Sequence, residues 1–109
     1  MLTAFQKKVL EACSKIPQGY VTTYKLLAIA LNCKSYRAIG QALKKNPFAP
    51  SIPCHRVIAS DLTPGGYQGK KGGKALRKKL QLLKKEGVIF KKGHILDPSK
   101  VIELVKTKD

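Results

Sequence analysis

The segment from Ile52 to Val57 reads IPCHRV and places a thiol directly before an imidazole and a guanidinium. Cysteine reacts as the thiolate, and neighbouring cationic groups lower its pKa from about 8.5 towards neutrality. Cys54 is therefore the candidate nucleophile, with His55 beside it. A Cys-His pair alone is a weak signal, because a buried cysteine usually serves only packing. His55 also fits a purely structural, hydrogen-bonded histidine.

The other two cysteines, Cys13 and Cys33, fall on a predicted helix and at a predicted turn, and we interpret both as structural. The three cysteines are widely spaced and include no CxxC pair. This spacing predicts neither a disulfide framework nor a metal site.

The candidate nucleophile follows a stiff loop, because prolines at 47, 50 and 53 each fix φ and remove a backbone donor. We place the active-site loop at residues 46–58, with a short strand at Val57 and Ile58. The glycines at 65, 66, 69, 72 and 73 then predict a mobile or tightly turned loop.

Two short helices before this loop predict a helix-turn-helix over about residues 23–46. Thr23 can cap a helix from Tyr24 to about Leu31, and residues 32–34 form a turn. Ser35 can cap a second helix that runs to about Lys45.

The remaining chain adds an amphipathic helix over residues 3–16, which an extended link at residues 20–22 joins to the helix-turn-helix, and a longer helix over residues 74–86. In the longer helix, Leu76, Leu80 and Leu83 form the predicted buried stripe, with lysines over much of the remainder. The tail at residues 88–109 predicts a small hairpin, or a short helix near residues 98–105. We expect residues 1–109 to form one domain, mostly α with a short β element.

The charge of the chain is strongly one-sided, with 22 Lys and Arg against 6 Asp and Glu and a formal net charge of +16. A hydrophobic content of 43% argues against disorder. Nucleic acid is the commonest polyanionic partner of such a domain, although solubility or life at high temperature would also favour a basic surface. The longest apolar run, residues 26–31, is too short for a membrane span, and no targeting signal opens the chain. We expect a cytoplasmic, nucleoid-associated or nuclear protein.

Six segments in this order, TYKLLA, YRAIG, KKNP, PCHRV, GGY and LLKKEG, resemble the O6-alkylguanine-DNA alkyltransferases. The resemblance covers about residues 5–87, the catalytic DNA-binding domain of that family. Its members transfer the alkyl group of O6-alkylguanine in DNA irreversibly to their cysteine. The resemblance implies a winged-helix-like domain of the alkyltransferase C-terminal type that needs no cofactor and no metal. It also implies a monomer that binds alkylated double-stranded DNA through the minor groove.

The resemblance assigns the chemical roles residue by residue. Cys54 corresponds to the alkyl acceptor, and His55 to the base that takes its proton through a water molecule. Glu86 would orient His55, and Asn46 corresponds to the hinge asparagine that ties the turn after the recognition helix. Glu86 follows Leu83 by three residues, so helical spacing also turns it towards the interior. Taken without the resemblance, Glu86 also fits a surface charge and Asn46 an ordinary loop residue.

The resemblance also assigns the DNA contacts. Tyr24 would press on the 3′ phosphate and help to rotate the base, and Arg37 would fill the gap left by the extruded nucleotide. Ala38 and Gly40 are small enough for a close approach to the groove. Tyr24 also fits a core aromatic and Arg37 a solvated helix charge. Possible phosphate contacts, some of which could simply be solvated, are Lys44, Lys45, Lys70, Lys71 and Lys74.

The resemblance implies a substrate pocket that involves Tyr24, Pro53, Val57, Tyr67 and Gln68, in which main-chain groups near Cys54 and Val57 read the guanine. Gln68 departs from the residues common at its position in the family, which leaves the accepted alkyl size open. Compared with the family, we also expect no counterpart of the N-terminal domain that many members carry, and there is extra length between Gly69 and Leu76.

Two alternatives remain open. The tail GVIFKKGHILD is similar to the alkyltransferase-like proteins, which bind alkylated DNA and recruit other repair factors without transferring the alkyl group. Those proteins typically replace the reactive cysteine, often by tryptophan, so Cys54 favours transfer. The other alternative is a basic helix-turn-helix transcription factor in which Cys54 has no chemical role.

Overall fold

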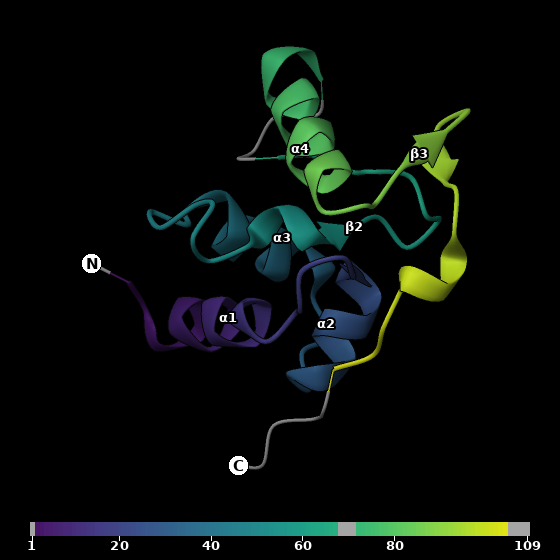
Figure 1. Ribbon diagram of the computed structural model, residues 1–109. Coiled ribbons are helices and arrows are strands. Elements are labelled where there is room, and N and C mark those ends of the chain that lie inside the picture. The colour runs from purple at the N-terminus through teal and green to yellow at the C-terminus, as the bar shows by residue number, and fades with distance from the viewer. Residues whose placement is uncertain (1, 68–71, 105–109) are drawn as a thin grey trace.

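The computed structural model describes residues 2–67 and 72–104, in which far more residues lie in helices than in the very short strands (Figure 1). The α-helices are α1 (Ala4–Ser14), α2 (Tyr24–Ala30), α3 (Tyr36–Lys44) and α4 (Gly73–Lys85). The strands are β1 (Thr22–Thr23), β2 (Val57–Ile58), β3 (Phe90–Lys91) and β4 (His94–Ile95). Two 3-10 helices complete the described elements, η1 (Cys54–Arg56) and η2 (Pro98–Lys100).

Polar side chains cap the N-termini of the first three helices. The hydroxyls of Thr3, Thr23 and Ser35 each accept a hydrogen bond of 3.0–3.1 Å from the backbone N–H three residues later. Such caps satisfy donors that have no partner inside the helix. The predicted caps Thr23 and Ser35 are confirmed, and so is the helix-turn-helix that they introduce.

The three N-terminal helices enclose the main core. Val9 and Cys13 of α1, Leu27 of α2, and Ile39 and Leu43 of α3 all belong to one buried apolar cluster. Cys13 has no exposed surface, in agreement with a structural role. This core fixes α3, the second helix of the helix-turn-helix, against α1 and α2.

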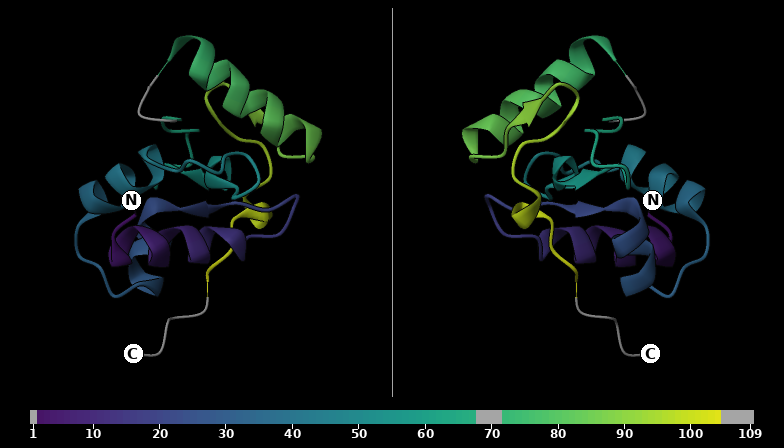
Figure 2. Two further views of the ribbon diagram at one scale, coloured as in Figure 1. Left: turned by 90° about the vertical axis from the view of Figure 1, so that its left-hand side faces the viewer. Right: turned by 90° about the vertical axis from the view of Figure 1, so that its right-hand side faces the viewer.

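A parallel pair of strands joins the start of the helix-turn-helix to the active-site segment. Thr22 of β1 is in register with Val57 of β2, and Thr23 with Ile58. The sequence predicted both extended segments but not their pairing, which links positions more than thirty residues apart. Figure 2 shows α1 on one side of this pair and α4 on the other.

Helix α4 buries a different face from the predicted leucine stripe. Leu83 is fully buried, but Leu76 and Leu80 are only half-buried. The prediction of lysines on the remaining surface was wrong for Lys79, which has no exposed surface. Lys79 precedes Leu83 by one helical turn and so points in the same direction.

The tail forms a hairpin followed by a 3-10 turn, so both predicted alternatives contribute. Strands β3 and β4 pair antiparallel, with Phe90 opposite Ile95. Lys92 and Gly93 at the turn both have positive φ, as a tight two-residue hairpin turn requires. Within the described parts of the chain, no helix combines the length and apolar character of a membrane span.

Candidate active site

Cys54 lies at the first position of η1, where the proline-rich loop ends. Asn46 holds this loop at two points, because its Nδ2 donates to the Ile52 carbonyl at 2.9 Å and its Oδ1 accepts from the Phe48 N–H at 2.9 Å. The Cys54 N–H donates to the same Ile52 carbonyl at 2.8 Å. Asn46 is itself buried. The loop that carries the thiol is therefore fixed by a buried side chain.

The two residues after Cys54 converge on one carboxylate. His55 Nε2 lies 3.2 Å from both carboxylate oxygens of Glu86. Arg56 donates to the same group through Nε at 2.9 Å and Nη2 at 2.6 Å, and its Nη1 donates to the Ile16 carbonyl at 2.7 Å. Glu86 thus holds η1 against the end of α4.

The protonation states follow from these contacts. Burial raises the pKa of Glu86, but hydrogen bonds from Arg56 and His55 outweigh it and leave the pKa below its usual value. Burial lowers the pKa of His55, against the opposing effect of Glu86. At neutral pH the carboxylate is therefore ionised and the imidazole neutral. An ionised carboxylate only accepts hydrogen bonds, so Nε2 carries the imidazole proton and Nδ1 keeps a free lone pair. Nδ1 is buried, with no hydrogen-bond partner among the described residues.

The electrostatic environment of Cys54 differs from the expectation. Burial raises the pKa of Cys54 above its usual value, and Asn46, Lys79 and the local backbone only partly offset this. The predicted decrease towards neutrality was wrong for the free protein. Burial of the thiol is the main cause, and neither Arg56, which is bound by Glu86, nor the neutral His55 offsets it.

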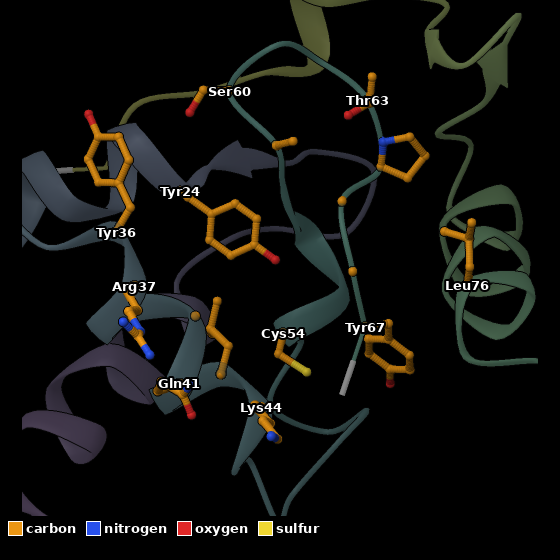
Figure 3. A pocket seen from close by; sticks show the side chains of 16 residues that line it. Tyr24, Tyr36, Arg37, Gln41, Lys44, Cys54, Ser60, Thr63, Tyr67 and Leu76 are labelled. Atoms are coloured by element: carbon orange, nitrogen blue, oxygen red, sulfur yellow. The ribbon is translucent and has the colours of Figure 1, made fainter. Parts of the chain in front are cut away.

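Cys54 borders a cavity of about 880 Å³, although only 5% of the residue is exposed. Figure 3 shows Tyr24, Cys54 and Tyr67 around the same space, with α3 on one side and Leu76 of α4 on the other. The volume lies within the range of about 300–1,000 Å³ that is typical of small-molecule sites. The described lining residues are Tyr24, Tyr36, Arg37, Gly40, Gln41, Leu43, Lys44, Cys54, Ala59, Ser60, Thr63, Pro64, Gly65, Gly66, Tyr67 and Leu76.

Known proteins resemble this domain in sequence and in fold. The family described as 6-O-methylguanine DNA methyltransferase, DNA binding domain, matches residues 4–88. The chain belongs to this family. The methylated-DNA-protein-cysteine methyltransferase of Methanothermobacter thermautotrophicus is 46% identical over 86 residues, covering 79% of this chain and 46% of the relative. That of Archaeoglobus fulgidus is 46% identical over 89 residues, covering 79% of this chain and 58% of the relative. The chain spans about half the length of these relatives.

Two solved structures have folds similar to that of this domain. The O6-methylguanine-DNA methyltransferase from Pyrococcus kodakaraensis strain KOD1 matches with a TM-score of 0.69 and 44% identity, over 80% of this chain and 48% of that chain. S. pombe Atl1, in complex with damaged DNA containing O6-carboxymethylguanine, matches with a TM-score of 0.78 and 28% identity, over 94% of this chain and 99% of that chain. The predicted fold class, a mostly helical helix-turn-helix domain of the alkyltransferase type, is confirmed.

The structure brings together only part of the predicted pocket of this methyltransferase-family domain. Tyr24 and Tyr67 line the cavity, but Pro53 and Val57 do not. Both are buried, and the Val57 side chain belongs to the main core, so neither side chain lines the cavity, and the expected contact of main-chain groups near Val57 with guanine stays a prediction. Gln68 lies outside the described residues, as do Lys70 and Lys71.

Of the residues predicted to contact DNA, some lie at the cavity and others do not. Arg37, Gly40 and Lys44 of α3 reach the cavity rim. Ala38 is half-buried on the same helix, and Lys45 is exposed just after it, and neither lines the cavity. Lys74 is exposed near the start of α4.

Several residues of the site were not predicted from the sequence. Arg56 was interpreted as a charge acting on Cys54, and nothing in its neighbourhood indicated Glu86 as its partner. Gln41 could have been found, because Arg37, Gln41 and Lys44 recur at helical spacing on one face of α3. Lys79 could have been found in the same way from its spacing to Leu83 and Glu86. The 59–66 segment gave no signal beyond its glycines.

Proposed function

We propose that this domain repairs O6-alkylguanine in double-stranded DNA by transferring the alkyl group irreversibly to Cys54. One observation carries the proposal. The thiol opens into a cavity large enough for a purine, and the next residue is a neutral histidine held by an ionised carboxylate. A nucleophile, a base and a group that orients the base together constitute the arrangement that activates a cysteine.

The transfer is a direct displacement. The Cys54 proton passes to the free lone pair of His55 Nδ1 through one water molecule, while the Nε2 proton stays on His55 and is donated in a hydrogen bond to Glu86, which stabilises the imidazolium. The Cys54 sulfur then attacks the alkyl carbon, so that an S–C bond forms as the bond from carbon to O6 breaks. The electron pair of the broken bond stays on the purine, which takes up one proton and leaves as guanine. The scheme needs no cofactor, because the chain supplies both the acceptor and the base.

The alkylated base must leave the duplex to reach a thiol that is 5% exposed. Extruding a base costs a few kcal/mol of stacking and pairing, and a planar cation inserted in its place offsets part of this. Arg37 is exposed on α3 at the cavity rim and suits that role. Tyr24 borders the same cavity, where it can help to rotate the base.

The surface of α3 supports the proposed binding to DNA. Nothing lies within 4 Å of a Cβ built on Gly40, so a groove can approach the helix backbone at this point. We place α3 in the minor groove, with Lys44, Lys45 and Lys74 as phosphate contacts. Residues 1–109 would act as one catalytic and DNA-binding domain, and as a monomer, because one chain contains the whole set of reacting groups.

A second candidate function has its own observation. The match covers almost the whole length of Atl1, unlike that to the methyltransferase relatives, of which it covers only about half. A domain that binds damaged DNA as a sensor is therefore the alternative. Cys54, with His55 and Glu86 arranged beside it, favours transfer over sensing.

The deciding experiment is incubation with duplex DNA containing O6-methylguanine, followed by intact-mass analysis and peptide mapping. We expect one methyl group per chain, on Cys54, and a reaction that stops at one turnover. Cys54→Ala should bind the lesion without being modified, whereas Cys33→Ala, which removes a half-buried thiol away from the cavity, should react like the wild type. An unmodified wild-type protein that remains bound to the lesion would support the sensor instead. Preference for one undamaged sequence would support a transcription factor.

A further inference from the structure

One wall of the cavity is the loop over residues 59–66, called here the pocket loop. Its residues that line the cavity are Ala59, Ser60, Thr63, Pro64, Gly65 and Gly66. Figure 3 shows Ser60 and Thr63 on this loop. The loop also lies against Tyr24, because a Cβ built on Gly65 would be 3.3 Å from the tyrosine ring. The position of the pocket loop therefore sets the shape of the space beside Cys54.

Leu62 belongs to the pocket loop but does not line the cavity. Its φ of +70° lies in the left-handed region, which is unfavourable for a residue with a Cβ and persists only where the surroundings enforce it. A glycine would adopt this conformation without that cost. The leucine side chain instead packs against a second buried cluster, which consists of Val21, Ile58, Leu83, Val88 and Ile95. Packing of this side chain therefore holds the loop in a strained conformation.

The C-terminal hairpin supplies the contacts that hold Leu62. The Ile95 N–H donates to the Leu62 carbonyl at 2.9 Å, and both side chains pack in the second cluster. Ile95 is only 6% exposed, and Phe90, opposite it in the hairpin, packs against the same cluster. Of the described residues in β3 and β4, none lines the cavity. The hairpin thus holds the pocket loop at a residue that does not itself face the cavity.

The remaining polar contacts of the pocket loop are of two kinds. Within the loop, the Ala59 N–H donates to the Thr63 carbonyl at 3.1 Å and the Leu62 N–H to the Ala59 carbonyl at 2.9 Å. These bonds fix the shape of the turn but not its place in the domain. At the other end of the loop, Lys79 Nζ donates to the Gly66 carbonyl at 2.9 Å. The place of the turn itself is set by the hairpin, through Leu62.

We propose that the β3–β4 hairpin is part of the substrate site, because it positions the pocket loop, through Leu62, as the wall that encloses the extruded alkylated purine. This inference rests on the proposed function in taking O6-alkylguanine as the occupant of the cavity. Leu62 and Ile95 are positioning residues, since neither lines the cavity. The hairpin follows residue 88, where the match to the family ends.

The role concerns binding of the base rather than the chemical step. If the contact between Leu62 and Ile95 is weakened, the pocket loop leaves its place for part of the time. The base then binds only to the fraction of molecules whose loop is in place, so its apparent affinity falls by that fraction. Once the base is bound, the wall is complete and Cys54 reacts as before. A hairpin that only stabilised the domain would leave the affinity of folded molecules unchanged.

The test weakens the contact from each side. Ile95→Ala removes most of a buried hairpin side chain, and Leu96→Ala, at the next residue and 57% exposed, is the matched control. Leu62→Ala shortens the loop side chain, whereas Leu62→Met keeps an apolar side chain of similar volume. Urea unfolding establishes that each variant is folded.

The assay uses the free base O6-benzylguanine, so that no contact with DNA contributes. Intact-mass analysis follows transfer of the benzyl group over time at several base concentrations. These data give the limiting rate and the half-saturating concentration, which equals the dissociation constant where the chemistry is slower than release of the base.

We expect Ile95→Ala and Leu62→Ala to raise the half-saturating concentration about fivefold, the effect of a loop that is in place about one-fifth of the time. Their limiting rates should equal that of the wild type. Leu96→Ala and Leu62→Met should keep both wild-type values. Because the two residues act through one contact, the double variant should show less than the product of the two single effects.

Amide hydrogen exchange measures the contact without any base. The Ile95 N–H is protected by the Leu62 carbonyl, so it should exchange faster in Leu62→Ala than in the wild type or Leu62→Met. Unchanged exchange would show that the Leu62 side chain does not hold the loop on the hairpin, and would overturn the inference.

The kinetic results can also overturn it. Folded Leu62→Ala and Ile95→Ala variants with the wild-type half-saturating concentration would leave the hairpin a purely stabilising role. If Ile95→Ala does not fold, Leu62→Ala and Leu62→Met decide the question. If the wild type accepts no alkyl group from the base or from DNA, the proposed function fails, and exchange of the Ile95 amide alone decides whether the hairpin holds the pocket loop.

Discussion

Replacing Glu86 by glutamine tests the polar cluster behind the thiol. The carboxylate accepts two hydrogen bonds from Arg56, at 2.9 and 2.6 Å, and both of its oxygens lie 3.2 Å from His55 Nε2. Glutamine has the same shape but no charge, and its NH₂ group would face an N–H donor of Arg56. Glu86→Gln therefore removes the charge and converts one hydrogen bond into a donor-donor contact.

The expected loss of stability follows from burial. Removing one partner of a fully buried ion pair costs about 3–5 kcal/mol. The side chains of Arg56 and Glu86 are 15% and 13% exposed, so solvent screens part of the interaction. We therefore expect the free energy of unfolding to fall by about 2–3 kcal/mol, which corresponds to a decrease of about 10 °C in Tm for a domain of this size.

Urea unfolding of the wild type and Glu86→Gln at several pH values measures this loss. Because the pKa of Glu86 is held below its ordinary value, its contribution is fully present above that ordinary value and is lost as the pH falls through the lowered folded-state value. The difference between the two proteins should be constant near neutrality and shrink in acid. Glu103→Gln, at an exposed position, is the control. A difference below about 0.5 kcal/mol at neutral pH, typical of an exposed pair, would refute the reasoning. A difference that does not change in acid would also refute it.

Three further predictions concern backbone space and the buried lysine. Gly65 has a φ of +72°, and a Cβ there would lie 3.3 Å from the Tyr24 ring, so Gly65→Ala should lower the free energy of unfolding by about 1–2 kcal/mol in urea; an unchanged value would contradict this. Gly40→Ala should raise the free energy of unfolding by about 0.5–1 kcal/mol yet weaken duplex binding in a titration; unchanged affinity would argue against close approach of the groove. Because the folded-state pKa of Lys79 is about 7, against 10.5 for the free side chain, the unfolded chain binds more protons between these values. Stability should therefore rise with pH across that window, and Lys79→Met should abolish the rise measured by urea unfolding.

The parts of the fold that the sequence predicted correctly depend on neighbouring residues. Thr23 and Ser35 each satisfy a backbone N–H three residues later, so the signal and its consequence lie within one helical turn. The stiff loop before Cys54 is likewise a local effect of its prolines. These short-range constraints sufficed to outline the helix-turn-helix and to locate the thiol.

The parts that the sequence did not predict depend on contacts between distant residues. Arg56 and His55 meet Glu86 about thirty residues away, so their effect on Cys54 could not be deduced from the IPCHRV segment alone. In α4, the predicted buried face contains the leucines and the observed buried face contains Lys79. Both faces include Leu83, so they differ only by a modest rotation about the helix axis. Apolar periodicity favours the leucines, and only the Val57 and Gly66 carbonyls favour burial of the lysine.

The polar contacts that hold α4 on the domain are the same contacts that organise the thiol. Glu86, the C-cap of α4, binds the two residues after Cys54, and Lys79 near the middle of α4 binds the carbonyls of Val57 and Gly66. A displacement of α4 would therefore release His55 and the pocket loop together. Because buried polar groups are strongly destabilising when only partly satisfied, intermediate positions of the helix are unfavourable. Docking of α4 and assembly of the reactive site are thus one cooperative step, and a substitution that loosens this helix should reduce Cys54 reactivity even where it touches no lining residue.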